Sequence, residues 1–375
     1  VLKLKCRGIK YAQYLIDIDN SNDAFDFRSR EILKILPPKN SANFMHINSI
    51  KYSLLSFFKK NNSIYVESLC YIFIPFLKKQ RFSYVKTGNK LADEILEIYQ
   101  FHYNLSYYTY HISKFILDYL DVNTFVSIDD SRYANELIVA SKELDIYSVG
   151  YMHGRFNEYH VALPEFTYNK YMVWSDYFKK KIISLSESYT ESNIEISGHF
   201  RLNGKLINSN KKHTNNILWL GESNINVEEV IPYIKAMIGL GYKVIYRGKP
   251  GSINSASDFI KDNQIECNDS TNYFEALKEE DIAIVVGTHS TALLESWLVG
   301  VPSIALRTSY DYGNHLWEDH LIDICNQPIE LCELLSKNSS ADLSYVEERK
   351  KNIWNNDYVC KISKVKEIIY SKMKK

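Results

Sequence analysis

Apolar and polar residues alternate in two regular series between residues 124 and 307. The first series predicts strands at 124–130, 146–154, 168–175 and 193–200, and helices at 131–145 and 176–186. The second predicts strands at 216–223, 242–251, 282–288 and 301–307, and helices at 227–241, 255–263, 273–281 and 289–300. Strands that alternate with helices through short connections favour a parallel sheet with helices on both faces. The pattern therefore predicts an α/β chain with two doubly wound, Rossmann-like domains.

The first 120 residues have a weaker pattern. Strands are predicted at 13–19 and 62–69, and the pair Pro37 and Pro38 marks a break between them, because consecutive prolines do not continue a helix. Residues 91–120 have apolar residues at helical spacing and predict one long helix. We interpret the tyrosines of this helix as packing residues rather than as a ligand cage.

A polar, basic stretch at 204–216 has no periodicity and is interpreted as an interdomain linker. The last residues predict an amphipathic terminal helix. We therefore divide the chain into domains at 1–205 and 206–340, followed by a C-terminal helical segment at 341–375.

Composition excludes several classes of function. Lys and Arg total 45 and Asp and Glu total 45, so no overall field attracts nucleic acid or an anionic membrane, and any anionic ligand must be bound by local groups. Six scattered cysteines without a C-x-x-C pair argue against a zinc site and a disulfide framework. The longest apolar run is about half of the ~20 residues that span a membrane. We expect a cytoplasmic protein and leave association with the inner face of the membrane open.

The strand ends of the second domain carry candidate binding residues, because ligands of parallel sheets bind beyond the carboxyl ends of the strands. The turn after the predicted strand at 282–288 is small and rich in hydroxyls: Gly287, Thr288, His289, Ser290 and Thr291. Its glycine allows close approach, and free N–H groups at the start of a helix suit a phosphate. The alternative is an ordinary helix cap made by Thr288 or Ser290.

Further candidates lie on neighbouring segments of the second domain. Arg247 and Lys249 follow another strand and would supply the cations that a chain without net charge needs for a phosphate. Glu295, about one turn into the helix, would accept hydrogen bonds from both hydroxyls of a ribose; the alternative is a solvated helix residue. No G-x-x-x-x-G-K-[ST] motif and no dinucleotide fingerprint accompany them.

The first domain offers candidate catalytic groups. Asp129 and Asp130 follow the predicted strand at 124–130, although an aspartate there is often a helix cap. His153 follows another strand beside a glycine, with Glu158 close behind in the sequence. A histidine in this place suits a general base because its pKa lies near neutral pH. The alternative is a hydrogen bond to a neighbouring loop.

The segment GTHSTALLESWLVGVPSIAL resembles the donor-binding end of GT-B glycosyltransferases, in which a Ser/Thr-rich turn holds phosphate, a following Glu holds ribose and Gly-x-Pro follows. The resemblance in architecture covers residues 120 to 335. It implies two Rossmann-like domains that face a cleft, with the acceptor on 1–205 and the nucleotide-sugar on 206–340.

Within this fold the chain is similar to the bacterial Kdo-transferases and polysialyltransferase-like enzymes of capsule and lipopolysaccharide synthesis, which use CMP-sugars. The pair Lys249 and Pro250 stands where these enzymes have His-Pro, and Ser290 with Thr291 fits their Ser/Thr motif. The resemblance implies a carboxylate nucleophile, for which Glu222 is the candidate. Asp129 and Asp130 are its rivals.

We therefore predict a metal-independent glycosyltransferase that moves a sugar, CMP-Kdo ahead of other donors, onto an oligosaccharide or lipid-linked glycan. Domain closure would bring His153, Glu158 or an aspartate of the first domain to the anomeric carbon. One alternative is a CDP-polyol phosphotransferase of the teichoic-acid type, because His153 and Gly154 resemble its His-Gly motif. Another is a binding module for nucleotide-sugars without catalysis. No cofactor other than the donor is expected.

Overall fold

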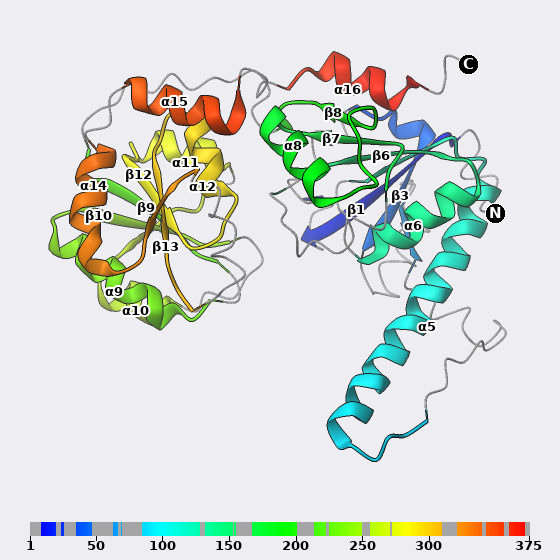
Figure 1. Cartoon of the computed structure of the whole chain (residues 1–375), viewed down its shortest axis with the longest axis horizontal. Coiled ribbons are helices and arrows are strands. Elements are labelled where there is room, and N and C mark those ends of the chain that lie inside the picture. Colours follow the sequence, from blue (N-terminus) through cyan, green and yellow to red (C-terminus); the bar gives the residue numbers. More distant parts are fainter. Residues whose placement is uncertain are drawn as a thin grey trace. The chain divides into compact units, whose positions relative to one another are not determined.

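The chain divides into two compact units in the computed structural model (Figure 1). Unit 1 comprises Val1–Trp174, Lys179–Arg201 and Cys360–Lys375, and unit 2 comprises Ser175–Phe178 and Leu202–Val359. The structure describes residues 9–19, 24–25, 35–46, 63–66, 69, 85–127, 132–152, 154, 167–200, 214–222, 225–249, 256–270, 272–309, 321–339, 343–355 and 360–371. The main division falls four residues before the predicted boundary at 205, and the expected C-terminal segment contributes to both units.

Unit 1 contains a sheet of strand order β4-β3-β1-β5-β6-β7-β8, with β2 beside β1. All neighbours along this order are parallel, and β2 alone is antiparallel among the described strands. The strands are β1 (Tyr11–Asp19), β2 (Ala24–Phe25), β3 (Ser41–His46), β4 (Ser63–Tyr65), β5 (Thr124–Ser127), β6 (Tyr147–Tyr151), β7 (Lys170–Val173) and β8 (Ile194–Ile196). The helices are α5 (Lys90–Tyr119), α6 (Arg132–Glu143), α8 (Asp176–Leu185) and α16 (Ile362–Ile369), with a 3-10 turn η1 (Pro38–Asn40).

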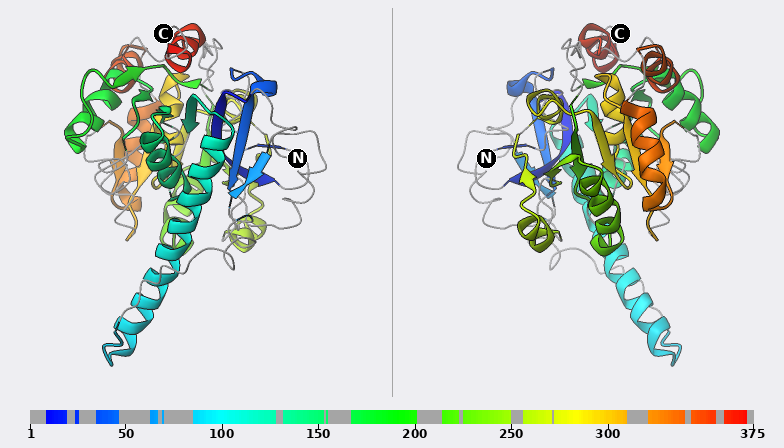
Figure 2. Two further views of the ribbon diagram at one scale, coloured as in Figure 1. Left: turned by 90° about the vertical axis from the view of Figure 1, so that its right-hand side faces the viewer. Right: turned by 90° about the vertical axis from the view of Figure 1, so that its left-hand side faces the viewer.

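The longest helix in the described parts of the chain, α5, begins after a residue that marks its start in the sequence. The Asn89 side chain caps it by accepting hydrogen bonds from the backbone N–H groups of Leu91 and Ala92 (3.1 and 3.2 Å). Its C-terminal half packs beside α6, whereas Figures 1 and 2 show its N-terminal half extending beyond the sheet of its own unit. No helix in the described parts of the chain is long and apolar enough to cross a membrane.

One strand of unit 1 differs from the prediction near the double proline. Pro38 begins the 3-10 turn η1, and β3 follows it at once, a strand that the sequence did not predict. β3 pairs with β1 along its whole length, from Tyr11 opposite Ser41 to Ile16 opposite His46. The strand was missed because its sequence does not alternate clearly, and pairing with β1 decides its conformation.

Unit 2 has a sheet of strand order β11-β10-β9-β12-β13-β14, all parallel. The strands are β9 (Asn216–Leu220), β10 (Lys243–Arg247), β11 (Glu266–Cys267), β12 (Ile284–Gly287), β13 (Ser303–Leu306) and β14 (Asp323–Cys325). The helices are α9 (Val227–Gly239), α10 (Ser257–Asp262), α11 (Tyr273–Glu279), α12 (Ala292–Leu298), α14 (Leu331–Ser339) and α15 (Leu343–Trp354), with a 3-10 turn η5 (Pro328–Glu330).

Helices cover both faces of the unit 2 sheet. Alternate strand residues such as Trp219 and Val286 pack with α9, α10 and α14 in one apolar cluster. α12 lies with α11 and α15 on the other face, where Trp297 is 1% exposed. β12 is buried at every position, as expected for a strand between two helical layers. The predicted doubly wound α/β architecture is confirmed.

Candidate functional site

The candidate residues of the second domain lie where the strand order of unit 2 reverses. Taken in chain order, the six strands are arranged 3-2-1-4-5-6, so β9 and β12 are neighbours although three helices separate them in the sequence. α9 leaves β9 onto one face and α12 leaves β12 onto the other. Their diverging connections make this edge the place where such sheets bind ligands.

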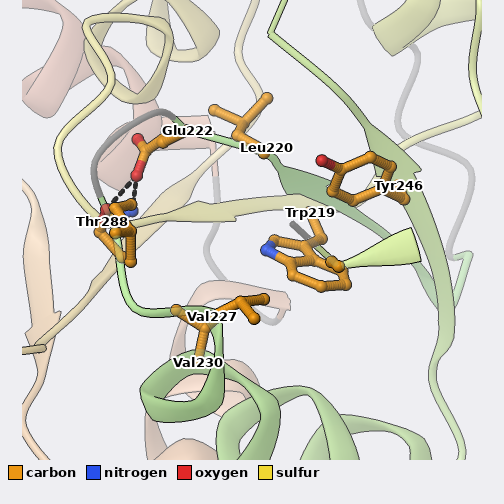
Figure 3. Close-up of a pocket in the computed structure, with 10 residues that line it drawn as sticks. Trp219, Leu220, Glu222, Val227, Val230, Tyr246 and Thr288 are labelled. Atoms are coloured by element: carbon orange, nitrogen blue, oxygen red, sulfur yellow. Dashed lines mark hydrogen bonds between the residues drawn. The ribbon is translucent and has the colours of Figure 1, made fainter. Parts of the chain in front are cut away.

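Glu222 and the turn after β12 meet at this edge (Figure 3). The Glu222 carboxylate accepts hydrogen bonds from the backbone N–H groups of Thr288 (2.8 Å), His289 (3.0 Å) and Ser290, and from the Thr288 hydroxyl. The Glu222 side chain is only 3% exposed. The turn predicted to hold a phosphate thus holds an oxyanion of the chain itself, and a nucleophilic role of Glu222 requires this carboxylate to leave its donors.

The same contacts fix the proton position on His289. Its Nδ1 lies 3.1 Å from the Thr288 hydroxyl oxygen and 3.5 Å from Oε2 of Glu222. Because the Thr288 hydroxyl has one hydrogen and donates it to Glu222, Nδ1 must be the donor toward Thr288. Neutral His289 therefore carries its proton on Nδ1, and Nε2 is an acceptor. The His289 side chain is 17% exposed, whereas the Glu222 side chain is 3% exposed.

Two glycines leave room for close packing at this edge. A Cβ at Gly287 would lie 3.2 Å from Cβ of Leu220, which is a tight contact, and 3.4 Å from Oε1 of Glu222, which is an ordinary van der Waals contact. A side chain at Gly221 would clash with the hydroxyl of Tyr246. The prediction that Gly287 lets a ligand approach the backbone stays a prediction; Leu220 and Glu222 are the groups beside it in this structure.

A small cavity lies beside Glu222 (Figure 3). Trp219, Tyr246, Val227 and Val230 line its apolar side, and Glu222 is at its polar side. Its volume is about 20 Å³, on the order of one water molecule. A cavity of this size does not hold a nucleotide.

Sequence reasoning missed the two aromatic residues of this cavity. Trp219 and Tyr246 are directly opposite each other on β9 and β10, and their ring centroids are 4.9 Å apart. Burial, with a small effect from Cys267, raises the pKa of Tyr246 above its usual value. The period of two along both strands could have placed them on one face, but the pairing of β9 with β10 was needed to bring them together.

Arg247 ends β10 and interacts with the neighbouring strand. Its Nη1 donates to Oδ1 of Asn268 (2.6 Å), and the Asn268 amide donates in turn to Glu280 (3.1 Å). Burial lowers the pKa of Arg247, opposed by Tyr273 and Asp269, but the guanidinium stays charged at neutral pH. Lys249 is exposed, and Pro250 lies outside the described residues. Arg247 is thus a half-buried cation at the same sheet edge as Glu222.

The remaining residues of the turn lead into α12. The helix begins at Ala292, whose N–H donates to the Ser290 hydroxyl (3.2 Å), and its N-cap residue is Thr291 rather than the predicted Thr288 or Ser290. Thr291 is half-buried. Glu295 is 1% exposed and is therefore a buried residue of α12. This excludes the alternative of a solvated helix residue, and its predicted contact with a ribose stays a prediction.

The candidates of the first domain lie at the edge of the other sheet. β5 ends at Ser127 and β6 at Tyr151, and these parallel neighbours finish at the same edge. Asp129, Asp130, His153 and Glu158 follow these strands in the sequence but lie outside the described residues. Their predicted catalytic roles stay predictions.

Comparison with solved structures identifies the fold. MurG of Acinetobacter baumannii matches with a TM-score of 0.54 at 11% identity, covering 96% of this chain and 99% of that one. CalG4, the calicheamicin glycosyltransferase, matches at 0.58 and 10%, covering 98% and 99%. A UDP-GlcNAc 2-epimerase of Methanocaldococcus jannaschii in complex with UDP-GlcNAc and UDP matches at 0.53 and 12%, covering 93% and 97%.

These similarities extend over nearly the whole chain, and the predicted GT-B fold is confirmed. At identities of 10 to 12% the likeness shows the fold alone. No protein-family model matches the sequence, and no curated protein matches it either. The resemblance to Kdo-transferases and polysialyltransferases therefore remains an interpretation of its motifs.

Proposed function

We propose that the chain is a glycosyltransferase that takes a sugar from a nucleotide donor bound at the carboxyl edge of the unit 2 sheet. The observation that carries the proposal is the turn of Thr288, His289 and Ser290, which binds an oxyanion at the reversal of strand order. The GT-B fold supports it, because MurG and CalG4 have the same architecture and CalG4 is a glycosyltransferase.

Donor binding in this proposal exchanges one oxyanion for another. A phosphate oxygen accepts hydrogen bonds from the same three N–H groups as the Glu222 carboxylate does. The donor therefore displaces Glu222 from the turn. Hydrogen bonds from the turn then stabilise the leaving nucleotide. The released Glu222 carboxylate then becomes available as a base or nucleophile next to the bound phosphate.

The nature of the donor is a finer part of the proposal. We place a UDP-sugar first, because the epimerase of similar fold binds UDP-GlcNAc and UDP. CMP-Kdo comes second and rests on Ser290, Thr291 and the Lys249–Pro250 pair alone. The proposed acceptor is an oligosaccharide or a lipid-linked glycan of a bacterial surface.

The structural likeness to a UDP-GlcNAc 2-epimerase favours a second candidate function. An epimerase would bind the same donor and return an altered nucleotide-sugar without any acceptor. A CDP-polyol phosphotransferase would instead release CMP from CDP-glycerol, and a non-catalytic module would bind a nucleotide-sugar and leave it intact. Reaction products therefore distinguish these four activities.

A melting-temperature screen of the full chain with UDP, CMP, CDP and GDP tests the donor site first. A nucleotide at about 100 times its Kd should raise Tm by about 2–4 °C. The nucleotide-sugars of each base that binds are then incubated with and without glycan acceptors. Acceptor-dependent release of nucleotide supports the transferase, and an epimerised donor supports the second candidate. No shift with any nucleotide would remove the donor site.

The exchange at the turn has its own test. Glu222→Gln weakens the competing acceptor while keeping its size, so nucleotide affinity should rise about tenfold, whereas Glu347→Gln, an exposed control on α15, leaves it unchanged. The double variant Ser290→Ala with Thr291→Ala should weaken nucleotide binding. Weaker binding by Glu222→Gln would reject the exchange.

A further inference from the structure

The N-terminal half of α5 carries an exposed apolar face, made of Leu91, Ile95, Ile98, Tyr99 and Tyr103. Their side chains are exposed by 67%, 57%, 59%, 58% and 44%, in that order. At ~100° per residue they lie within an arc of about 140° around the helix. We call this set the α5 apolar face. Contiguous apolar surface of this kind marks interaction sites in soluble proteins.

The same side of the helix is buried farther along. Because 18 residues make about five helical turns, Ile98 points in the same direction as Ile116, and Tyr99 in the same direction as Leu117. Ile116 and Leu117 are 4% and 0% exposed and belong to the core of unit 1. The helix thus continues one apolar side through both halves, and among the described parts of unit 1 the elements packed on it cover the second half (Figures 1 and 2).

Three tyrosines of α5 illustrate the same difference. Tyr108, in the second half, is 7% exposed, as expected for a packing residue. Tyr99 and Tyr103, in the first half, keep much of their surface exposed. A tyrosine covers a large area at a low cost in conformational entropy, which is why such residues are enriched in protein interfaces.

Charge argues against a lipid surface as the occupant. Residues 85–104 contain Lys86 and Lys90 but Asp93, Glu94 and Glu97, which gives 2 − 3 = −1. Helices that bind anionic membranes carry lysines and arginines along their polar side. Residues 98–113 have no Lys, Arg, Asp or Glu, so the apolar face ends in neutral polar residues, as interfaces between proteins do.

We propose that the α5 apolar face binds the same face of a second copy of this chain. Each side chain of this size offers roughly 100 Å² in its exposed part, so two copies would bury about 1,000 Å² in total. This area is at the lower limit for a specific interface. In a two-fold dimer both copies contribute the same face, so its exposed area counts twice. An interface of this size is of the weak, reversible class.

Sedimentation velocity of the full chain over a micromolar concentration series tests the dimer. The double variant Ile95→Glu with Ile98→Glu should weaken self-association at least about 100-fold, since each charge enters the interface twice. Phe115→Glu is the matched control: Phe115 is 66% exposed on the same helix but lies outside the face, and its variant should dimerise like the wild type. Circular dichroism verifies that helix content is kept, and Ile98→Ser serves as a milder second variant.

Three results would overturn the proposal. The first is a wild-type chain that stays monomeric throughout the series, which would assign the face to another part of the same chain. The second is a dimer that persists in the Ile95→Glu, Ile98→Glu and Ile98→Ser variants. The third is co-sedimentation with phosphatidylglycerol vesicles by a monomeric wild type that these variants abolish.

Discussion

Buried hydroxyls at one place in each unit differ in whether they are hydrogen-bonded. In unit 2, Nε1 of Trp297 donates to the Ser303 hydroxyl (2.9 Å), which donates to the Leu293 carbonyl (2.6 Å). In unit 1, by contrast, the hydroxyls of Ser113 and Ser141 are fully buried on α5 and α6 without a hydrogen-bond partner in the described parts of the chain. Both units have doubly wound sheets, so the difference lies in side chains rather than in topology.

The comparison separates buried polar groups that fix the positions of their neighbours from those that do not. A hydrogen-bonded group in the interior fixes the position of its partners, whereas a buried hydroxyl without a partner only costs the free energy of losing water. In unit 2 these hydrogen-bonded groups lie on α12, which follows the turn that binds Glu222, and on β13, which pairs with β12. We therefore expect substitution of Ser303 in unit 2 and of Ser141 in unit 1 to act in opposite directions.

The largest effect is expected at Glu222. Glu222→Ala leaves the N–H groups of Thr288, His289 and Ser290 without their acceptor, which should destabilise the edge of β12 by about 2–4 kcal/mol. Hydrogen exchange of the β9 and β12 amides reports the local free energy of opening. Glu347→Ala on the exposed side of α15 should change it by less than about 0.5 kcal/mol. Equal effects of the two variants would contradict a structural role for the Glu222 contacts.

Ser303→Ala should have the next largest effect. The substitution removes the acceptor of the buried Trp297 N–H and a donor to Leu293, at a cost of about 1–3 kcal/mol. Hydrogen exchange in β13 and α12 measures the loss. Ser184→Ala on α8, whose exposed hydroxyl bonds within its own helix, is the control and should be nearly neutral. A neutral Ser303→Ala would remove the contrast between the units.

Acid should weaken unit 2 through Asp323. Burial would raise the pKa of Asp323, but hydrogen bonds from Asn338 and Lys337 and the charges of Lys337 and Arg349 outweigh it and hold the pKa below its usual value. The stabilisation is therefore present above the unfolded pKa of about 4 and is lost as pH falls through the lower folded pKa. Asp323→Asn should lose about 1 kcal/mol at pH 7 and flatten the acid limb of an unfolding profile. An unchanged acid limb would show that other groups cause it.

The smallest effect, with the opposite sign, is expected in unit 1. Ser141→Ala removes a buried hydroxyl without a partner in the described structure and adds a better helix former, so α6 should gain about 0.5 kcal/mol. Ser113→Ala on α5 should behave alike. Exchange of the α6 amides measures the gain, and a loss of more than about 1 kcal/mol would reveal a hydrogen bond that these serines make.

Much of the fold could be predicted because the signals are local. Strands such as β9 and β12 are continuous apolar runs, and helices such as α9 have amphipathic spacing, so both follow from neighbouring residues. β3 and the two-residue β11 were not predicted. Short strands carry too little periodicity to be recognised, and pairing with a neighbour is what holds them in place.

The candidate site was predictable only in part, for the same reason. Gly287, Thr288 and Ser290 were found because they follow a buried strand, and a strand end is a local feature. Their contact with Glu222 was not, because that residue stands 66 positions earlier than Thr288. Trp219 and Tyr246 were missed because the sequence does not show that β9 pairs with β10.

The sequence by itself determined which segments are strands and helices, and which polar residues stand at strand ends, because the period of side chains along the backbone is set by local geometry. Only the tertiary structure decided that Glu222 binds the turn at Thr288 and that half of α5 is left exposed. Strand order and helix packing depend on which apolar faces cover each other across the whole chain, and no local period encodes that choice.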